Sequence, residues 1–235
     1  AMGAFPSFVL AALQLPEDHR ADEVLACMKG LSEAAERSGC AVAGGNIVVY
    51  RGPFTITLSV EGRLPEGRAP LRRSGALRGD LICSTGMPGM ARIGLETLQR
   101  GGRTDSEFVT SCVEKCLRPT ACVAEVDFLL KRAALHAACD VSDGLAGDLG
   151  HVLQQSRCGA ELVPEKVIPE AYKTACRKLG LEPRACFFGP SDDYELLLTG
   201  VFSDFDGISG EFAHRFGRKL CRLGTITEGA GIEAV

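Results

Sequence analysis

The sequence lacks the features that mark membrane, secreted and nucleic-acid-binding proteins. None of its apolar runs approaches the roughly 18 residues that a membrane-spanning helix needs, and the longest near the start, Phe8 to Leu13, stops at Gln14. No basic segment precedes that run, which argues against a secretory signal. Lys and Arg number 26 against 30 Asp and Glu, a net charge of -4, so the basic face typical of nucleic-acid binding is not indicated. We therefore expect neither a membrane nor a nucleic acid as a partner.

The eleven cysteines form no C-x-x-C pair, and their number is odd. Neither a disulfide framework nor a zinc ribbon is therefore indicated. Cys112, Cys116 and Cys122 are instead spaced like positions along a helix. We interpret the cysteines as small core residues in a reducing compartment, which predicts a cytoplasmic protein. The four histidines likewise show no spacing typical of metal ligands.

What is present is the composition of a globular protein. Hydrophobic residues make up 46% of the 235 positions and charged residues 24%, as in ordinary folded domains. This length can form one large domain or two smaller ones. The stretch from Leu64 to Pro70 holds two prolines and a glycine without periodicity, which is typical of a hinge. We predict a first domain over residues 1–68 and a second over residues 69–235.

Periodicity predicts helices and strands that alternate along the chain. Apolar residues at helical spacing predict a helix from about Ala21 to Ser38, and alternating apolar and hydroxyl side chains predict a strand over Phe54 to Val60. The apolar run Cys40 to Ala43 indicates a buried strand that enters a tight turn at Gly44-Gly45. Further strands are predicted at about 80–85, 138–140, 194–199 and 221–227, and further helices from about 91, over 121–134 and after 144. This alternation predicts the α/β fold class.

The most informative acidic segment lies where a predicted strand gives way to a helix. It contains Asp140, Ser142 and Asp143, followed by Asp148. Ser142 or Asp143 can cap the helix by accepting a hydrogen bond from a free backbone N–H. Capping would explain one acid well but Asp140 and Asp148 less well, although Asp148 could simply face solvent one turn further along the helix.

A second acidic segment, Ser191 to Glu195, holds three acids in four residues. The simple alternative is a polar turn before the apolar strand that follows. Two carboxylates within about 5 Å repel each other by roughly 3 kcal/mol at an effective dielectric near 20. A cationic substrate or a divalent ion would relieve that repulsion, and magnesium is suited because it commonly bridges carboxylates to phosphates. We expect the two acidic segments to converge around magnesium.

Three other segments bear on phosphate binding. Gly44-Gly45-Asn46 would let the backbone approach a phosphate closely, unless it is a plain turn. Arg72-Arg73 offers planar cationic donors suited to phosphate, unless it is a solvated basic patch. The loop from Gly86 to Gly89 lacks the Lys-Ser/Thr of a P-loop, so a Walker-type site is not supported.

Taken in this order, the segments resemble the thiamine-monophosphate kinase family, within the superfamily that contains aminoimidazole ribonucleotide synthetase. The resemblance covers almost the whole chain. It rests most on D-V-S-D-G-L-A-G-D-L from Asp140 to Leu149 and on S-D-D-Y-E-L-L-L-T from Ser191 to Thr199. Supporting stretches are A-M-G at 1–3, A-G-G-N at 43–46, R-S-G-A-L-R-G-D at 73–80 and L-G-T-I-T-E-G at 223–229.

The resemblance implies an activity, a fold and a set of site residues. The activity is the ATP-dependent phosphorylation of thiamine monophosphate to thiamine diphosphate with magnesium, by a homodimer. The fold is the two-domain α/β fold, of the α+β type, of that superfamily with a truncated first domain, and the strand from Phe54 to Val60 is the best candidate for the dimer interface. By the same resemblance, Asp140 and Asp143 are catalytic and hold magnesium together with Asn46. The resemblance also implies that the nucleotide is contacted by Gly44, Gly45, Arg73 and Ser142. It implies that thiamine monophosphate is contacted by Asp192, Asp193 and Glu195.

The sequence also departs from the family pattern. Asn46 stands where the family commonly has Asp, and Pro190-Ser191 stands where two glycines are usual. The chain opens inside the family's first domain, without the acidic cluster that precedes it there, and ends at Val235 before the usual C-terminal tail. We therefore expect this chain by itself to be weak or inactive as a kinase. Two alternatives stay open: a non-catalytic relative on the same fold, and a sister enzyme acting on another phosphate-bearing substrate.

Overall fold

A computed structural model describes residues 1–102 and 104–235. The chain forms two compact units, one of residues Ala4–Pro70 and one that combines Ala1–Gly3 with Leu71–Val235. The first three residues belong to the larger unit because the backbone N–H of Leu71 donates to the carbonyl of Met2 at 3.1 Å. The predicted boundary after residue 68 lies close to the division after Pro70. The prediction placed residues 1–3 in the first domain, whereas the structure groups them with the larger unit.

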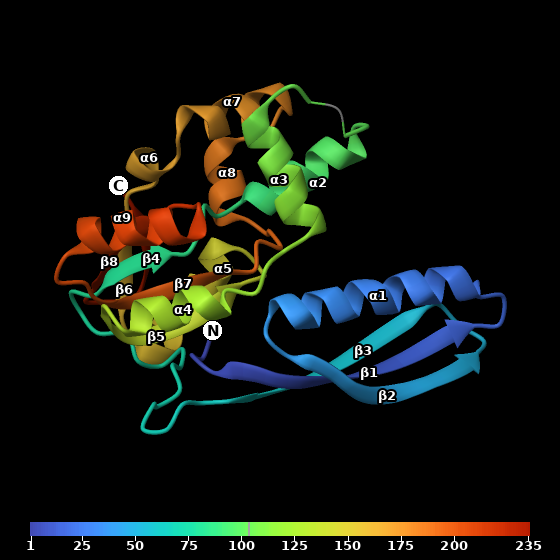
Figure 1. The fold of residues 1–235 in the computed structure, drawn as a ribbon. Helices are drawn as coiled ribbons and strands as arrows, with labels where there is room; N and C mark the ends of the chain where they lie inside the picture. The colour runs from blue at the N-terminus through green and yellow to red at the C-terminus, as the bar shows by residue number, and fades with distance from the viewer. Residues whose placement is uncertain (103) are drawn as a thin grey trace. The chain divides into compact units, whose positions relative to one another are not determined.

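The smaller unit is a three-stranded sheet with one helix on it (Figure 1). Strand β1 (Phe5–Pro16) lies in the middle, parallel to β2 (Ala41–Tyr50) and antiparallel to β3 (Thr55–Arg63). Helix α1 (Ala21–Arg37) follows the predicted range closely. Its residues Val24, Met28 and Leu31 pack on alternate residues of β1, namely Ala11, Leu13 and Leu15.

The turn predicted at Gly44-Gly45 is wrong, because both glycines lie inside β2. The paired strand explains the glycine: a Cβ at Gly45 would collide with the carbonyl oxygen of Ala11 on β1. A glycine inside a strand commonly marks such a close approach of two backbones.

Strand β3 carries apolar side chains that the unit leaves half-exposed. Ile56 and Leu58 pair with Leu13 and Ala11, so they share the face that α1 covers. A helix with its side chains is about 10–12 Å wide, whereas three strands span about 14 Å. The helix therefore covers β1 and leaves Ile56, Leu58 and Val60 between 38% and 61% exposed. The apolar face of this strand is thus only partly buried within the unit.

The larger unit is built on a six-stranded sheet in the order β5-β7-β4-β8-β6-β9. Neighbouring strands are antiparallel except β6 and β9, which are parallel. Their bounds are β4 Leu81–Ser84, β5 Ala134–Val141, β6 Gly159–Leu162, β7 Glu195–Val201, β8 Cys221–Thr227 and β9 Gly231–Ala234. One or more helices separate successive strands of this sheet except β8 and β9, and the combination of helices with a largely antiparallel sheet confirms the predicted α/β class of the α+β type.

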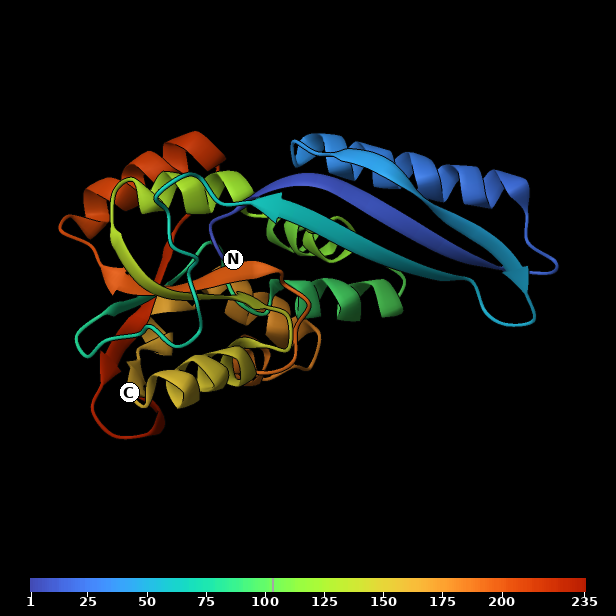
Figure 2. The same ribbon diagram turned by 90° about the horizontal axis from the view of Figure 1, so that it is seen from below.

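Helices cover both faces of this sheet, and Figure 2 shows α4 and α9 on one face and α5 on the other. Alternate residues of β7 supply the two cores: Leu197 faces one, and Leu196 and Leu198 face the other. The helices are α2 Met90–Gln99, α3 Glu107–Leu117, α4 Val123–Leu130, α5 Leu145–Ser156, α6 Pro164–Val167, α7 Glu170–Lys178, α8 Pro183–Phe188 and α9 Phe205–Phe216. Within the described residues, no helix combines the length and apolarity needed to cross a membrane.

The cysteines occupy the positions expected of small core residues. All eleven are free, and most are buried, including Cys83, Cys112, Cys139 and Cys176. Burial raises the pKa of the Cys112 and Cys139 thiols to about 12. These thiols are therefore protonated apolar side chains at neutral pH.

Candidate functional site

Strand pairing brings the two acidic segments side by side at one edge of the larger sheet. Val141, at the end of β5, pairs with Glu195 at the start of β7. The backbone N–H of Tyr194 donates to the carbonyl of Val141 at 2.8 Å. Gly144 has a φ of 105° and lacks the Cβ that would meet the carbonyl of Gly189. Backbone contacts thus bring the two segments together, whereas their convergence around magnesium stays a prediction. We call the surface formed by Asp140, Asp143, Asp192 and Tyr194 the acidic edge.

The loop that carries Asp143 is held by a third acid, Asp148. One carboxylate oxygen of Asp148 accepts hydrogen bonds from the backbone N–H groups of Ser142 and Asp143 at 3.0 and 3.1 Å. Asp148 is only 1% exposed, and this burial raises its pKa although both N–H groups act in the opposite direction. Helix α5 begins after Gly144 without a side-chain cap. The capping role considered for Ser142 and Asp143 is therefore wrong, and the carboxylate of Asp143 is exposed to solvent.

Arg73 lies beside the acidic edge. Its guanidinium nitrogen is 3.9 Å from a carboxylate oxygen of Asp140, and the two side chains are 44% and 45% exposed. An exposed ion pair at this distance is weak. Both groups can therefore contact a ligand without the loss of a strong internal interaction.

Tyr194 adopts an unusual backbone conformation at the acidic edge. Its φ is 51°, which is uncommon for a residue other than glycine. Its hydroxyl donates to Asp192 at 3.4 Å, and the charge of Asp192 is the main reason why the pKa of Tyr194 is raised. Asp140 and Asp143 raise that pKa further. The three carboxylates and the phenol therefore share one electrostatic environment, in which a cation would be attracted.

Asp193 points away from this surface into the interior. Its side chain is fully buried, and its two carboxylate oxygens accept hydrogen bonds from the backbone N–H groups of Gly89 and Ala91 at 2.6 and 2.8 Å. These N–H groups belong to the first turn of α2, whose free donors need acceptors. Burial raises the pKa of Asp193, while the two backbone hydrogen bonds act against it. Asp193 thus ties the second acidic segment to α2.

Glu195 is also buried, and cations surround it. Arg218 donates to both of its carboxylate oxygens at 2.6 and 2.7 Å, and Lys115 and Thr85 also bind it. Burial would raise the pKa of Glu195, but the charges of Lys115 and Arg218 outweigh burial and hold it below its usual value. Gly86 makes room for this carboxylate, because a Cβ there would collide with it.

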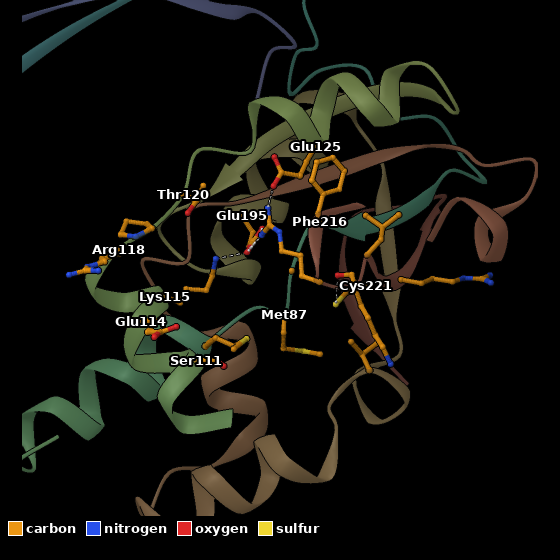
Figure 3. Close-up of a pocket in the computed structure, with 18 of the residues that line it drawn as sticks. Met87, Ser111, Glu114, Lys115, Arg118, Thr120, Glu125, Glu195, Phe216 and Cys221 are labelled. Carbon is orange, nitrogen blue, oxygen red and sulfur yellow. Dashed lines mark hydrogen bonds and ion pairs between the residues drawn. The ribbon is translucent and has the colours of Figure 1, made fainter. Parts of the chain in front are cut away.

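A cavity of about 1200 Å³ opens beside this cluster (Figure 3). Lys115 and Glu195 lie side by side along it, joined by an ion pair, with Met87 below them in the view. Arg218 extends the cluster by binding Glu125 at 2.6 Å. No local spacing in the sequence pointed to Lys115 or Arg218, because they lie 80 and 23 positions from Glu195.

The acidic edge suits a metal ion only in combination with a ligand. Within residues 1–102 and 104–235, no group of three or more His, Cys, Asp or Glu side chains could hold a metal ion alone. Magnesium, however, is usually bound by one or two carboxylates together with phosphates and waters. Asp140 and Asp143 supply two solvent-accessible carboxylates, which fits that mode of binding.

The remaining predicted residues belong to the other unit. Gly44, Gly45 and Asn46 lie on β2, and the side-chain oxygen of Asn46 accepts a hydrogen bond from the backbone N–H of Ile47 at 3.0 Å. Their assignments to nucleotide and magnesium stay predictions.

Comparison with known proteins gives consistent results. Residues 1–64 match the family model described as AIR synthase related protein, N-terminal domain. The thiamine-monophosphate kinase of Methanospirillum hungatei JF-1 is 30% identical over 234 residues, which cover 99% of this chain and 71% of that relative. The thiamine-monophosphate kinase of Aquifex aeolicus (strain VF5) is 33% identical over 200 residues, which cover 85% of this chain and 63% of that relative.

A solved structure is similar over the whole chain. AaThiL complexed with AMPPCP and TMP matches with a TM-score of 0.81 and 29% identity, covering 100% of this chain and 71% of that one. The matched sequence thus covers less than two thirds of the Aquifex aeolicus kinase, and the match covers 71% of the Methanospirillum hungatei kinase and 71% of the chain in the solved structure.

Proposed function

This chain belongs to the thiamine-monophosphate kinase family, and from that premise we propose that it forms the main part of a kinase that phosphorylates thiamine monophosphate to thiamine diphosphate with ATP and magnesium. The observation that carries the proposal is the meeting of solvent-facing Asp140 and Asp143 with Arg73 at one sheet edge. The similarity to AaThiL complexed with AMPPCP and TMP supports the same substrates.

Phosphoryl transfer requires positioning and charge neutralisation more than a strong base. Asp140 and Asp143 would hold magnesium, which when bound neutralises charge on the phosphates. Arg73 presents a guanidinium whose planar donors match phosphate oxygens. Ser142 lies between the two aspartates and would contact the nucleotide. The hydrogen bonds from Ser142 and Asp143 to Asp148 keep this loop in place before a ligand arrives.

The second acidic segment would bind thiamine monophosphate. Asp192 is exposed and faces the same surface as Tyr194, so we propose it as the direct contact. Asp193 and Glu195 were predicted to bind substrate as well. Because protein donors already occupy their carboxylates, we propose that they act by holding Asp192 and Tyr194 in position.

The proposal extends to the assembly and the compartment. Gly44, Gly45 and Asn46 would contribute to nucleotide and magnesium binding, as the family resemblance implies. The half-exposed apolar residues Ile56, Leu58 and Val60 of β3 support a homodimer through the smaller unit, and the free buried cysteines are compatible with the cytoplasm. Sedimentation tests the dimer, which a monomer at micromolar concentration would contradict.

The kinase proposal is tested by Asp143→Ala in the full-length protein. We expect the rate of thiamine diphosphate formation from ATP and thiamine monophosphate to fall by roughly 100-fold or more. Asp206→Ala, which removes an exposed acid from the first turn of α9, is the matched control and should retain full activity. Normal turnover by Asp143→Ala would remove this residue from the mechanism.

Asn46 favours a second candidate, a non-catalytic binding protein, because an amide replaces the negative charge of the usual aspartate. Calorimetry with magnesium and ATP, followed by thiamine monophosphate, separates the two candidates. Binding without turnover in the full-length protein would support the second candidate, and turnover would exclude it.

A further inference from the structure

The cavity beside Glu195 has a charge balance opposite to that of the chain. Six cationic residues line it against three glutamates, whereas the whole sequence has 26 Lys and Arg against 30 Asp and Glu. The six are Lys115, Arg118, Lys166, Arg218, Lys219 and Arg222. A cavity whose lining carries an excess of one sign of charge concentrates ligands of the opposite sign.

Internal ion pairs do not cancel this charge. Glu195 and Glu125 are neutralised by Lys115 and Arg218. Four of the lining cations, Arg118, Lys166, Lys219 and Arg222, form no ion pair with any residue that the structure describes. An anion in the cavity would therefore meet cationic groups that need not first release a carboxylate.

The lining also has an apolar part. Met87, Met90, Val167, Phe216 and Leu220 contribute to it. Small-molecule sites typically combine such a surface with a few charged groups, and about 1200 Å³ is ample for a nucleotide-sized molecule. The combination suits an anion with a flat apolar body better than a bare inorganic ion.

This cavity is separate from the acidic edge. Glu195 and Lys115 belong to the wall of the cavity (Figure 3), whereas the neighbouring Tyr194 contacts Asp192 at the surface. We propose that the cavity is a second ligand site, which binds an organic phosphate with an aromatic body. This site does not depend on the kinase assignment, because it needs neither Asp143 nor a metal ion.

The four methionines make the proposal directly testable. Met87 and Met90 line the cavity, whereas Met28 packs in the smaller unit and Met2 lies near the N-terminus. We would titrate phenyl phosphate in EDTA and follow ¹³C-methyl methionine NMR signals in the 235-residue chain and in the full-length protein. EDTA removes divalent ions, so the carboxylates of the acidic edge repel the probe.

We expect saturable shifts of the Met87 and Met90 signals, with Met28 and Met2 unchanged. Inorganic phosphate should bind more weakly than phenyl phosphate, and Asp143→Ala should leave the phenyl phosphate shifts intact. No shift at millimolar probe would overturn the proposal, as would equal affinity for the two probes. Loss of the shifts in Asp143→Ala would place the probe at the acidic edge instead. Shifts seen in the 235-residue chain but not in the full-length protein would show that the protein itself fills the cavity.

Charge reversal provides the matched variants. The double variant Lys166→Glu, Lys219→Glu should weaken phenyl phosphate binding about tenfold or more, because it replaces two attractive charges by repulsive ones. Lys178→Glu changes an exposed lysine at the end of α7 that does not line the cavity. It should leave the affinity unchanged. Equal affinities of the double variant and this control would refute the site.

Discussion

The two acidic segments have similar compositions but opposite arrangements. In the first, Asp140 and Asp143 direct their carboxylates toward solvent, because buried Asp148 holds the backbone of the loop. In the second, Asp193 and Glu195 turn their carboxylates inward and themselves hold α2, Lys115 and Arg218. The comparison teaches that a carboxylate stays available for ligands where another group, here Asp148, holds the surrounding backbone, and becomes unavailable where it holds that backbone itself.

The buried and the exposed carboxylates should therefore differ in what they contribute: the buried ones to the stability of the fold, the exposed ones to ligand binding. A buried carboxylate with protein partners contributes to folding, and its loss leaves those partners without an acceptor. An exposed carboxylate contributes little to folding, but its lone pairs stay free for a ligand. The following predictions test this division, beginning with the largest expected change in the free energy of unfolding.

Glu195→Ala should have the largest effect. It leaves Lys115 and Arg218, whose side chains are only 15% and 27% exposed, without their shared carboxylate. Removing one partner of a buried ion pair typically costs about 3–5 kcal/mol. We expect about 3 kcal/mol, because Glu125 still pairs with Arg218. Urea unfolding measures the change, and Glu114→Ala, an exposed glutamate of the same cavity, is the control. Equal stabilities of the two variants would contradict the structural role of Glu195.

Asp193→Ala should have the next largest effect. The substitution leaves the N–H groups of Gly89 and Ala91 without acceptors at the start of α2, which costs about 1–3 kcal/mol. Asp192→Ala changes the adjacent, exposed acid and should cost no more than about 0.5 kcal/mol. Thermal or urea unfolding of the two variants measures this difference between a buried and an exposed acid of the same segment. If Asp192→Ala were the more destabilising of the two, the inward role of Asp193 would be wrong.

Stability should depend on pH through Glu195. Lys115 and Arg218 hold its pKa below the unfolded value of about 4.3. A depressed pKa contributes stability that is present above the unfolded pKa and lost as pH falls through the folded pKa. The difference in unfolding free energy between the wild type and Glu195→Gln should therefore shrink from pH 6 toward pH 3. A difference that stays constant or grows over this range would show that the carboxylate charge is not what stabilises the cluster.

Asp143→Ala should have the smallest effect on folding. Its backbone N–H still donates to Asp148, so the unfolding free energy should change by no more than about 0.5 kcal/mol. Calorimetry should nevertheless show weaker binding of magnesium and ATP. Asp148→Ala is the converse variant, and it should destabilise the fold by about 1–3 kcal/mol because it removes the acceptor for two backbone N–H groups. A large loss of stability in Asp143→Ala would remove the distinction between the two acids.

Elements with a clear period were predictable, and elements without one were not. Helix α1 and strand β3 follow the ranges expected from apolar spacing. Strand β1 was not predicted, since the run from Phe8 to Leu13 is apolar at every position and gives no period. The interpretation of Gly44-Gly45 as a turn was wrong because the reason for glycine lies on the neighbouring strand, at the carbonyl of Ala11.

The sequence by itself determined the family, the fold class and the order of the acidic segments, because motif residues and apolar periods are local properties of the chain. Only the tertiary structure decided which acids face solvent and which are buried with partners. Glu195 meets Lys115 and Arg218 across 80 and 23 positions, and Asp193 meets Gly89 across 104. Such contacts arise from strand order and helix packing, so the spacing of residues along the chain does not reveal them.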